Sequence, residues 1–137
     1  MRIEPYLFFD GRCEEAIEFY KSAVGARENM LMRFSQGPEG HSSVHLPPGS
    51  GDKIMHASLQ IGDSVVMMSD GHCAGHAKFD GFHLSVSVSS DAEADRVFNA
   101  LSAGGKVTMP LAKTFYSSRF GMLLDRFGVG WMVIVAQ

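Results

Sequence analysis

The chain has 137 residues, the size of one compact domain with a hydrophobic core of its own. Its 45% hydrophobic and 20% charged residues exclude a disordered or collagen-like chain, and a net charge of −3 provides no basic surface for nucleic acid. Because the sequence shows no membrane-spanning run, no signal-peptide layout and only two cysteines, we expect a cytoplasmic protein with free thiols and no membrane partner.

The first half of the chain predicts a strand, a helix and three further strands. Apolar residues from Ala16 to Val24 recur at helical spacing, Asp10 can cap the start of this helix, and Gly25 can end it. A Gly-Asp turn at 62–63 separates two β-rich runs and predicts a hairpin. The predicted strands are Leu7–Phe9, Asn29–Phe34, Ile54–Ile61 and Ser64–Ser69, with a long loop at Gln36–Asp52.

The second half predicts the same order of elements. Ser90 and Glu93 have the spacing of a capping box, and apolar residues from Ala94 to Leu101 recur at helical spacing. The Gly-Gly pair at 104–105 can end this helix. The predicted strands are Phe82–Val88, Lys106–Pro110, Phe120–Asp125 and Trp131–Val135.

The strand Phe82–Val88 has two chemically different faces. His83, Ser85 and Ser87 point to one face, whereas the apolar side chains point to the other, because successive strand residues alternate. The apolar face can pack against a helix. The polar face is either part of a concave ligand-binding surface or an ordinary solvent-exposed face.

Several motifs together make the sequence similar to a known superfamily. They are Pro5–Gly11, Glu15–Lys21, His56–Leu59, Val66–Asp70, Phe115–Gly121, Asp125–Gly128 and Trp131-Met132. With them the chain resembles the PhnB-like branch of the glyoxalase/bleomycin-resistance, or vicinal oxygen chelate, superfamily. The resemblance implies an α+β fold in a single domain 1–137. Two βαβββ modules, at about 1–70 and 80–137, would form a cupped, incomplete mixed β-barrel, usually in a homodimer, with a ligand or metal site inside.

The metal site implied by this resemblance is incomplete. Metal-dependent members take one His or Glu from each of four strands, and these positions fall near Pro5, Val66 or Met68, His83 and Met132. Only His83 has the chemistry of a ligand for zinc, nickel, iron or magnesium, and a one-residue shift would add Glu4. Two ligands fall short of three, so we predict no bound cofactor, with Glu4 and His83 as the candidates if a divalent metal does bind.

The candidate ligand contacts come mainly from the second half. His83 is a candidate for ligand contact or proton transfer, or is a satisfied polar residue. Arg119 can grip an anionic group, or it pairs with Asp125 or a partner subunit. Aromatic rings and methionines would favour a partly apolar ligand. The predicted set is His83, Ser85, Met68, Phe115, Tyr116, Arg119, Trp131 and Met132.

Other patterns carry less information. His72, Cys73 and His76 are a candidate zinc cluster, but two glycines frame them, as in a surface loop. The nine methionines are expected to fill the core.

The sequence has no glycine-rich phosphate cradle. The strand-rich order also differs from the doubly wound sheet of Rossmann-type methyltransferases, although chains of this kind are sometimes labelled demethylubiquinone methyltransferase.

We therefore predict a protein that binds a small, partly apolar molecule without a complete metal site. One alternative is a metal-dependent lyase, isomerase or dioxygenase. Another is a protein that sequesters an antibiotic, as bleomycin-binding relatives do, without changing any bond. Metal content separates the first alternative from the prediction, and an unchanged ligand mass separates sequestration from catalysis.

Overall fold

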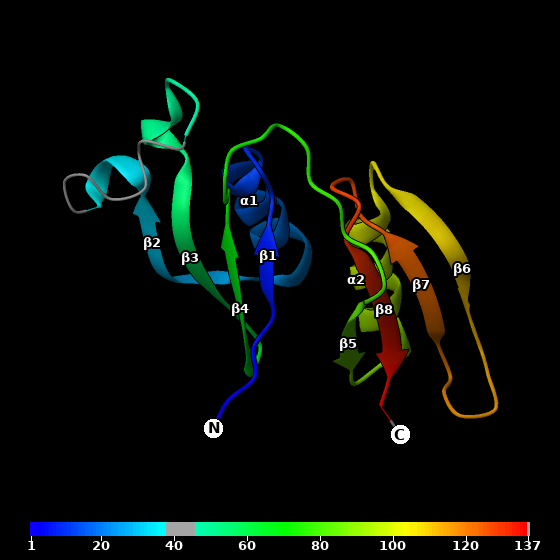
Figure 1. Cartoon of the computed structure of the whole chain (residues 1–137). Coiled ribbons are helices and arrows are strands. Elements are labelled where there is room, and N and C mark those ends of the chain that lie inside the picture. The colour runs from blue at the N-terminus through cyan, green and yellow to red at the C-terminus, as the bar shows by residue number, and fades with distance from the viewer. Residues whose placement is uncertain (38–45, 137) are drawn as a thin grey trace. The chain divides into compact units, whose positions relative to one another are not determined.

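The computed structural model describes residues 1–37 and 46–136, and its chain divides into two compact units (Figure 1). The first unit is Met1–Ala77 and the second is Lys78–Gln137. Each unit contains one long helix and a four-stranded mixed sheet. The order strand, helix, three strands occurs in both units, so the predicted α+β class and the repeated order of elements are confirmed.

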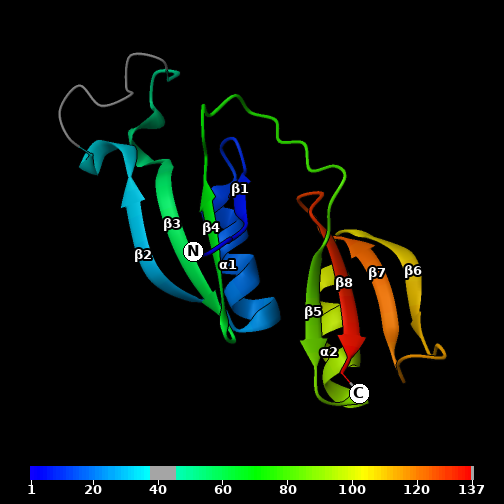
Figure 2. The same cartoon turned by 60° about the horizontal axis from the view of Figure 1, so that its bottom comes forward.

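In the first unit, parallel and antiparallel pairing build one sheet with the strand order β1-β4-β3-β2 (Figure 2). The β1 strand is parallel to β4, and the other neighbours are antiparallel. The predicted hairpin of the two β-rich runs is confirmed, because β3 and β4 pair around the turn at 62–63. The elements are β1 (Tyr6–Phe8), α1 (Cys13–Val24), β2 (Arg27–Arg33), β3 (Ile54–Ile61) and β4 (Ser64–Ser69).

The second unit repeats this topology with the strand order β5-β8-β7-β6. The β5 strand is parallel to β8, and the remaining pairs are antiparallel. The elements are β5 (Leu84–Val88), α2 (Asp91–Ser102), β6 (Lys106–Ala112), β7 (Phe120–Leu124) and β8 (Gly130–Val135).

The predicted loop between β2 and β3 contains short helical turns at its ends. The 3-10 turns η1 (Phe34–Gln36) and η3 (Ser50–Asp52) flank it, and residues 38–45 lie outside the described residues. Neither long helix among the described residues has the length and apolar character needed to cross a membrane.

The two helices begin in different ways. Ser90 caps α2 as predicted, because its hydroxyl oxygen accepts a hydrogen bond from the Glu93 backbone N–H at 3.1 Å. The predicted Asp10 cap of α1 is wrong. Arg12 occupies that position, and Asp10 instead has φ 50°, in the left-handed region that Asp and Asn tolerate better than most residues. Gly25 ends α1 with φ 67°, as predicted.

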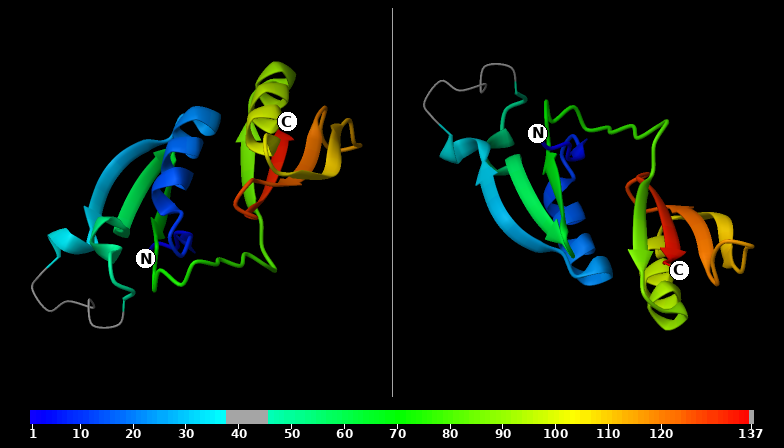
Figure 3. Two further views of the ribbon diagram at one scale, coloured as in Figure 1. Left: turned by 90° about the horizontal axis from the view of Figure 1, so that it is seen from above. Right: turned by 90° about the horizontal axis from the view of Figure 1, so that it is seen from below.

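In each unit the helix lies against one face of the sheet, as Figure 3 shows from above and below. The buried side chains of each unit form its core between these two layers. In the first unit, Leu7, Ala57 and Met68 are paired in one row and buried on the face toward α1. In the second unit, Leu123 and Trp131 are paired and buried on the face toward α2. This burial of one face per sheet is the main source of stability expected for such a two-layer unit.

Candidate functional site

Each sheet has one face packed against its helix and an opposite face, which we call its open face. On the first sheet, Tyr6, Met67, Ser58 and Met30 are paired in one row across the open face. Met30 is 45% exposed. The open face of the first sheet therefore carries thioether and aromatic side chains that the core does not use.

A cluster of three rings lies on this open face. The ring centroids of Tyr6 and Phe8 are 4.9 Å apart with an interplanar angle of 25°, and the Tyr6 hydroxyl is hydrogen-bonded to His56 Nδ1 at 2.8 Å. Tyr6 is 38% exposed and Phe8 is 53% exposed. Burial raises the pKa of the Tyr6 phenol, partly opposed by a hydrogen bond with Ser69, so the hydroxyl stays protonated at neutral pH.

A pocket of about 600 Å³ opens beside this cluster. It lies at the end of the sheet where β1, β2 and β4 finish and β3 begins. Its volume is in the range of small-molecule sites, and its lining mixes apolar rings with a few polar groups, as such sites do. The lining residues are Tyr6, Phe8, Asp10, Phe34, Leu46, Met55, Ser69, Gly71 and His72.

One buried carboxylate holds the chain segments around this pocket together. The oxygens of Asp70 accept hydrogen bonds from the backbone N–H groups of Gly11 at 2.6 Å, Cys13 at 2.9 Å and Ile54 at 2.8 Å. Asp70 is 1% exposed, and both of its chain neighbours line the pocket. Asp70 thereby fixes the start of α1 and the start of β3 relative to the end of β4.

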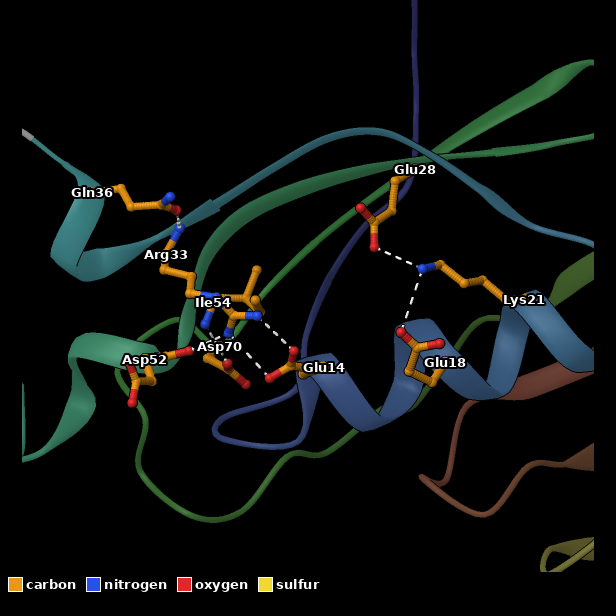
Figure 4. A network of polar contacts seen from close by, with 9 residues as sticks. All are labelled: Glu14, Glu18, Lys21, Glu28, Arg33, Gln36, Asp52, Ile54 and Asp70. Atoms are coloured by element: carbon orange, nitrogen blue, oxygen red, sulfur yellow. Dashed lines mark hydrogen bonds and ion pairs between the residues drawn. The ribbon is translucent and has the colours of Figure 1, made fainter.

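A second polar network fixes the end of β2 (Figure 4). The Arg33 guanidinium pairs with the Glu14 carboxylate at 2.6 Å and donates to the Asp52 carbonyl at 2.6 Å. The hydrogen bond from Arg33 lowers the pKa of Glu14. Gln36 accepts from the Arg33 backbone N–H at 2.8 Å, so the turn that carries Phe34 into the pocket is tied to α1.

The open face of the second sheet carries several of the predicted ligand contacts. Ser85, Met132, Met122 and Met109 are paired in one row across it. Ser85 is exposed and Met132 is half-buried. His83 lies on the same face and is also exposed, so the polar face predicted for β5 is confirmed.

His83 and the aromatic candidates lie at opposite ends of this open face. A Cβ added at Gly130 would lie 2.9 Å from three atoms of the His83 ring, which shows that the ring rests on the glycine backbone. The Tyr116 ring lies edge-on to Phe120, with centroids 5.6 Å apart, and Phe115 lies edge-on to Tyr116 at 4.9 Å. Phe120 is paired four positions along β8 from Gly130, a distance of about 13 Å.

Two predicted ligand contacts are core residues instead. Met68 is 0% exposed and faces α1, because the open-face residue at this point of β4 is Met67. Trp131 is 2% exposed, and its indole N–H donates to the Asp125 carboxylate at 2.9 Å. The structure corrects both assignments, so neither residue enters our functional proposal.

Arg119 is engaged by helix α2. Its guanidinium lies 3.5 Å from the Asp91 carboxylate and 3.4 Å from the Asp95 carboxylate. The predicted pairing with Asp125 is wrong, since the Asp125 oxygens accept hydrogen bonds from backbone and indole N–H groups. Arg119 therefore offsets the charge of α2 as an ion-pair partner rather than standing free for an anionic ligand.

The residues at the metal positions implied by the resemblance do not fit a divalent metal. Val66 is buried, and Met67 on the open face offers only a soft thioether. Glu4 pairs with Arg2 within the first unit, and His83 belongs to the second. Across residues 1–37 and 46–136, no three His, Cys, Asp or Glu side chains are grouped so that they could share a metal ion. We therefore derive no metal-dependent step.

Neither cysteine has the environment of an activated nucleophile. Cys13 is buried, and burial, followed by the nearby charge of Asp70, raises the pKa of its thiol far above the usual range. Burial also raises the pKa of Cys73. Both thiols therefore remain protonated at neutral pH.

The buried Cys13 predicts a loss of stability at alkaline pH. The pKa of the Cys13 thiol in the folded protein lies above the value of about 9 for an unperturbed thiol. The buried thiol therefore contributes fully to the free energy of unfolding below pH 9, and this contribution declines as the pH rises beyond 9, because the thiol ionises more readily in the unfolded chain. We expect Cys13→Ala to remove a slope of up to about 1.4 kcal/mol per pH unit from the free energy of unfolding. Urea unfolding at pH 8, 9 and 10 measures this slope.

Cys73→Ala is the matched control for this measurement, because it leaves the buried thiol in place. It should retain most of the alkaline slope. Equal slopes for the wild type and Cys13→Ala would show that the Cys13 thiol does not determine alkaline stability.

The sequence did not identify most residues of the first-unit pocket. Phe8 was predicted only as part of a strand, Asp10 as a helix cap and His72 as a candidate zinc ligand, and Tyr6 entered only through the resemblance. Because side chains alternate along a strand, Tyr6 and Phe8 lie on the face opposite Leu7. Two exposed rings followed by an acidic residue at the end of a strand could therefore have indicated this pocket.

Comparison with known proteins gives the family. The family described as 3-demethylubiquinone-9 3-methyltransferase matches residues 1–134. Protein YjdN of Escherichia coli is 35% identical over 142 aligned residues, covering 100% of this chain and 97% of YjdN. The crystal structure of protein PA1353 from Pseudomonas aeruginosa is 43% identical with a TM-score of 0.86, covering 100% of this chain and 98% of PA1353.

Three other solved structures are similar to this chain in fold. The PhnB protein from Bacillus cereus, described as a 3-demethylubiquinone-9 3-methyltransferase, is 27% identical with a TM-score of 0.79, over 99% of this chain and all of that one. The fosfomycin resistance protein FosX from Listeria monocytogenes is only 11% identical, with a TM-score of 0.66 over 100% of this chain and 93% of FosX, and shares the fold alone. The chain has the fold of a glyoxalase-related enzyme from Fulvimarina pelagi, which is 17% identical with a TM-score of 0.63 over 98% of this chain and 88% of that one. By its match over residues 1–134, the chain belongs to the family described as 3-demethylubiquinone-9 3-methyltransferase.

Proposed function

We propose that the protein binds a small, partly apolar molecule in the pocket of its first unit. The observation that carries this proposal is the pocket of about 600 Å³ beside the stacked and exposed rings of Tyr6 and Phe8. Exposed aromatic rings on the wall of a pocket of this size favour a ligand with a flat or branched apolar group.

The expected binding energy is modest. A ligand that removes roughly 100 Å² of apolar surface from water gains about 2.5 kcal/mol on the protein side. Hydrogen bonds from the Tyr6 hydroxyl or the His72 imidazole can orient the polar part of the ligand, because both side chains line the pocket.

The open face of the second sheet is a second contact surface in this proposal. His83, Ser85 and Met132 share that face, and Tyr116 is 43% exposed at its far end. In the same proposal the chain acts as a homodimer in the cytoplasm, and His83 remains the candidate for any proton transfer. Binding without chemistry, as in a sequestering protein, leaves the ligand mass unchanged.

The proposal predicts that the Phe8 ring contributes to ligand affinity. A fragment library screened by thermal shift should yield ligands whose affinity falls about tenfold in Phe8→Ala, because the loss of one aromatic wall costs about 1.4 kcal/mol. Titration calorimetry measures the dissociation constants.

Phe82→Ala is the matched control, since Phe82 is 41% exposed but lies outside the pocket. It should change each dissociation constant by less than twofold. Ligands that bind wild type and Phe8→Ala equally would contradict a site in the first-unit pocket.

A further inference from the structure

We propose that the first-unit pocket selects organic cations, specifically an alkylated ammonium group, through its aromatic rings and the carboxylate of Asp10. This inference rests on the proposed function, because it names the chemistry of the ligand for the same pocket. It is carried by the combination of aromatic side chains and one acidic side chain in the lining.

The aromatic part of the pocket suits a cation. Tyr6, Phe8 and Phe34 all contribute to the lining, and Tyr6 and Phe8 are both more than a third exposed. The negative face of an aromatic ring attracts a cation within about 6 Å of its centroid, and this attraction persists for alkylated ammonium groups that carry no hydrogen-bond donor. The Met55 thioether adds a polarisable apolar contact to the same lining.

The acidic part of the pocket is Asp10. Asp10 lies two residues beyond Phe8, the last residue of β1, so its carboxylate and the Phe8 ring belong to the same segment of the lining. Within the part of the chain that the structure describes, no side chain forms an ion pair with Asp10. Its charge is therefore available to a cationic ligand.

The charges beside the pocket act in both directions. The Lys53 ammonium donates to the Gly11 carbonyl at 2.9 Å and keeps its positive charge there. Asp70 adds a second negative charge behind the pocket wall. Burial is the main cause of the raised pKa of Cys73; Ser50 and Lys53 lower it, whereas Asp70 and Asp10 raise it. Among the described residues, the lining contains one carboxylate, that of Asp10, and no lysine or arginine.

The test compares two probes that differ in charge but hardly in shape. Choline carries a trimethylammonium group, and 3,3-dimethylbutan-1-ol has a neutral tert-butyl group in its place. At pH 8, where free imidazoles are neutral, the wild type is expected to bind choline at least tenfold more tightly than the neutral alcohol. NMR titration measures both affinities, including those in the millimolar range.

Asp10→Asn is the informative variant, because Asn tolerates the left-handed φ of 50° at this position and should preserve the fold. It should weaken choline binding at least fivefold and change the affinity for the neutral alcohol by less than twofold. Asp63→Asn, in the exposed β3–β4 turn, is the control and should change neither.

Equal affinities of the wild type for the two probes, or equal losses for both probes in Asp10→Asn, would overturn the selection of cations. Absence of choline binding would overturn it as well. The proposed function would still hold if neutral fragments bound in a manner sensitive to Phe8→Ala. If no fragment affinity depended on Phe8, the proposed function itself would fail.

Discussion

Asp70→Ala is expected to lower the free energy of unfolding by about 3–5 kcal/mol. The substitution leaves the backbone N–H groups of Gly11, Cys13 and Ile54 without their acceptor, and Cys13 and Ile54 are fully buried. Each buried unsatisfied donor costs about 1–3 kcal/mol, and relaxation of the neighbouring segments recovers part of the sum. Equilibrium urea unfolding, followed by circular dichroism, measures the loss.

Two further variants test whether this loss of stability is specific to the Asp70 carboxylate. Asp63→Ala removes an exposed carboxylate from the β3–β4 turn and should change stability by less than about 0.5 kcal/mol. The stability of Asp70→Asn should fall between those of the wild type and Asp70→Ala. The asparagine amide keeps one acceptor oxygen, but its NH₂ group replaces the other oxygen and faces a backbone N–H donor. A loss below about 1 kcal/mol for Asp70→Ala would contradict the role assigned to this carboxylate.

Gly105→Ala is expected to be the second large effect, with a loss of about 3 kcal/mol or more. An added Cβ would lie 2.1 Å from the Leu124 carbonyl oxygen and 2.8 Å from the Asp125 carbonyl carbon. Both are backbone atoms of the segment that ends β7, so the clash cannot be relieved by a side-chain rotation. Overpacking usually costs 1–3 kcal/mol, and displacing a paired backbone adds to that cost.

Gly51→Ala is the matched control for the steric argument. Its added Cβ would lie 3.5 Å from the Ser35 Cβ, which is an ordinary contact. Chemical denaturation should show a change of less than about 1 kcal/mol for Gly51→Ala. Similar losses for the two variants would mean that close approach to Leu124 is not the reason for glycine at position 105.

The order of elements could be predicted because local signals and hydrophobic periodicity agreed. The helix from Cys13 to Val24 repeats apolar residues at helical spacing, and the hairpin of β3 and β4 surrounds a Gly-Asp turn. The cap of α1 was missed because its N-terminal N–H groups are satisfied by Asp70, 57 residues away from Cys13 in the sequence. Such a long-range contact leaves no local pattern.

The site was harder to predict because a one-residue error in a strand exchanges its faces. The sequence predicts Met68 as a ligand contact, but Met68 is a core residue and its neighbour Met67 lies on the open face. The sequence predicts Trp131 as a ligand contact, whereas its indole N–H donates to the buried Asp125 carboxylate. Residue type alone does not distinguish these two uses of an aromatic side chain.

The pocket itself depends on segments that are separated in the sequence. Phe34, Met55 and Gly71 meet beside Phe8 because antiparallel pairing of β2 with β3 and of β3 with β4 brings these strand ends together. The sequence predicted these strands, but it did not predict that their ends meet beside the Asp10 carboxylate and the exposed Phe8 ring.

The most direct test of ligand binding in the first unit is an amide NMR titration of the isotopically labelled protein with the tightest fragment from the thermal-shift screen. We predict that the largest chemical-shift changes occur at Phe8, Asp10, Gly71 and His72, the residues that line the pocket at the end of β1 and β4. Chemical-shift changes confined to the second unit, with none at these four residues, would contradict the assignment of the binding site to this pocket.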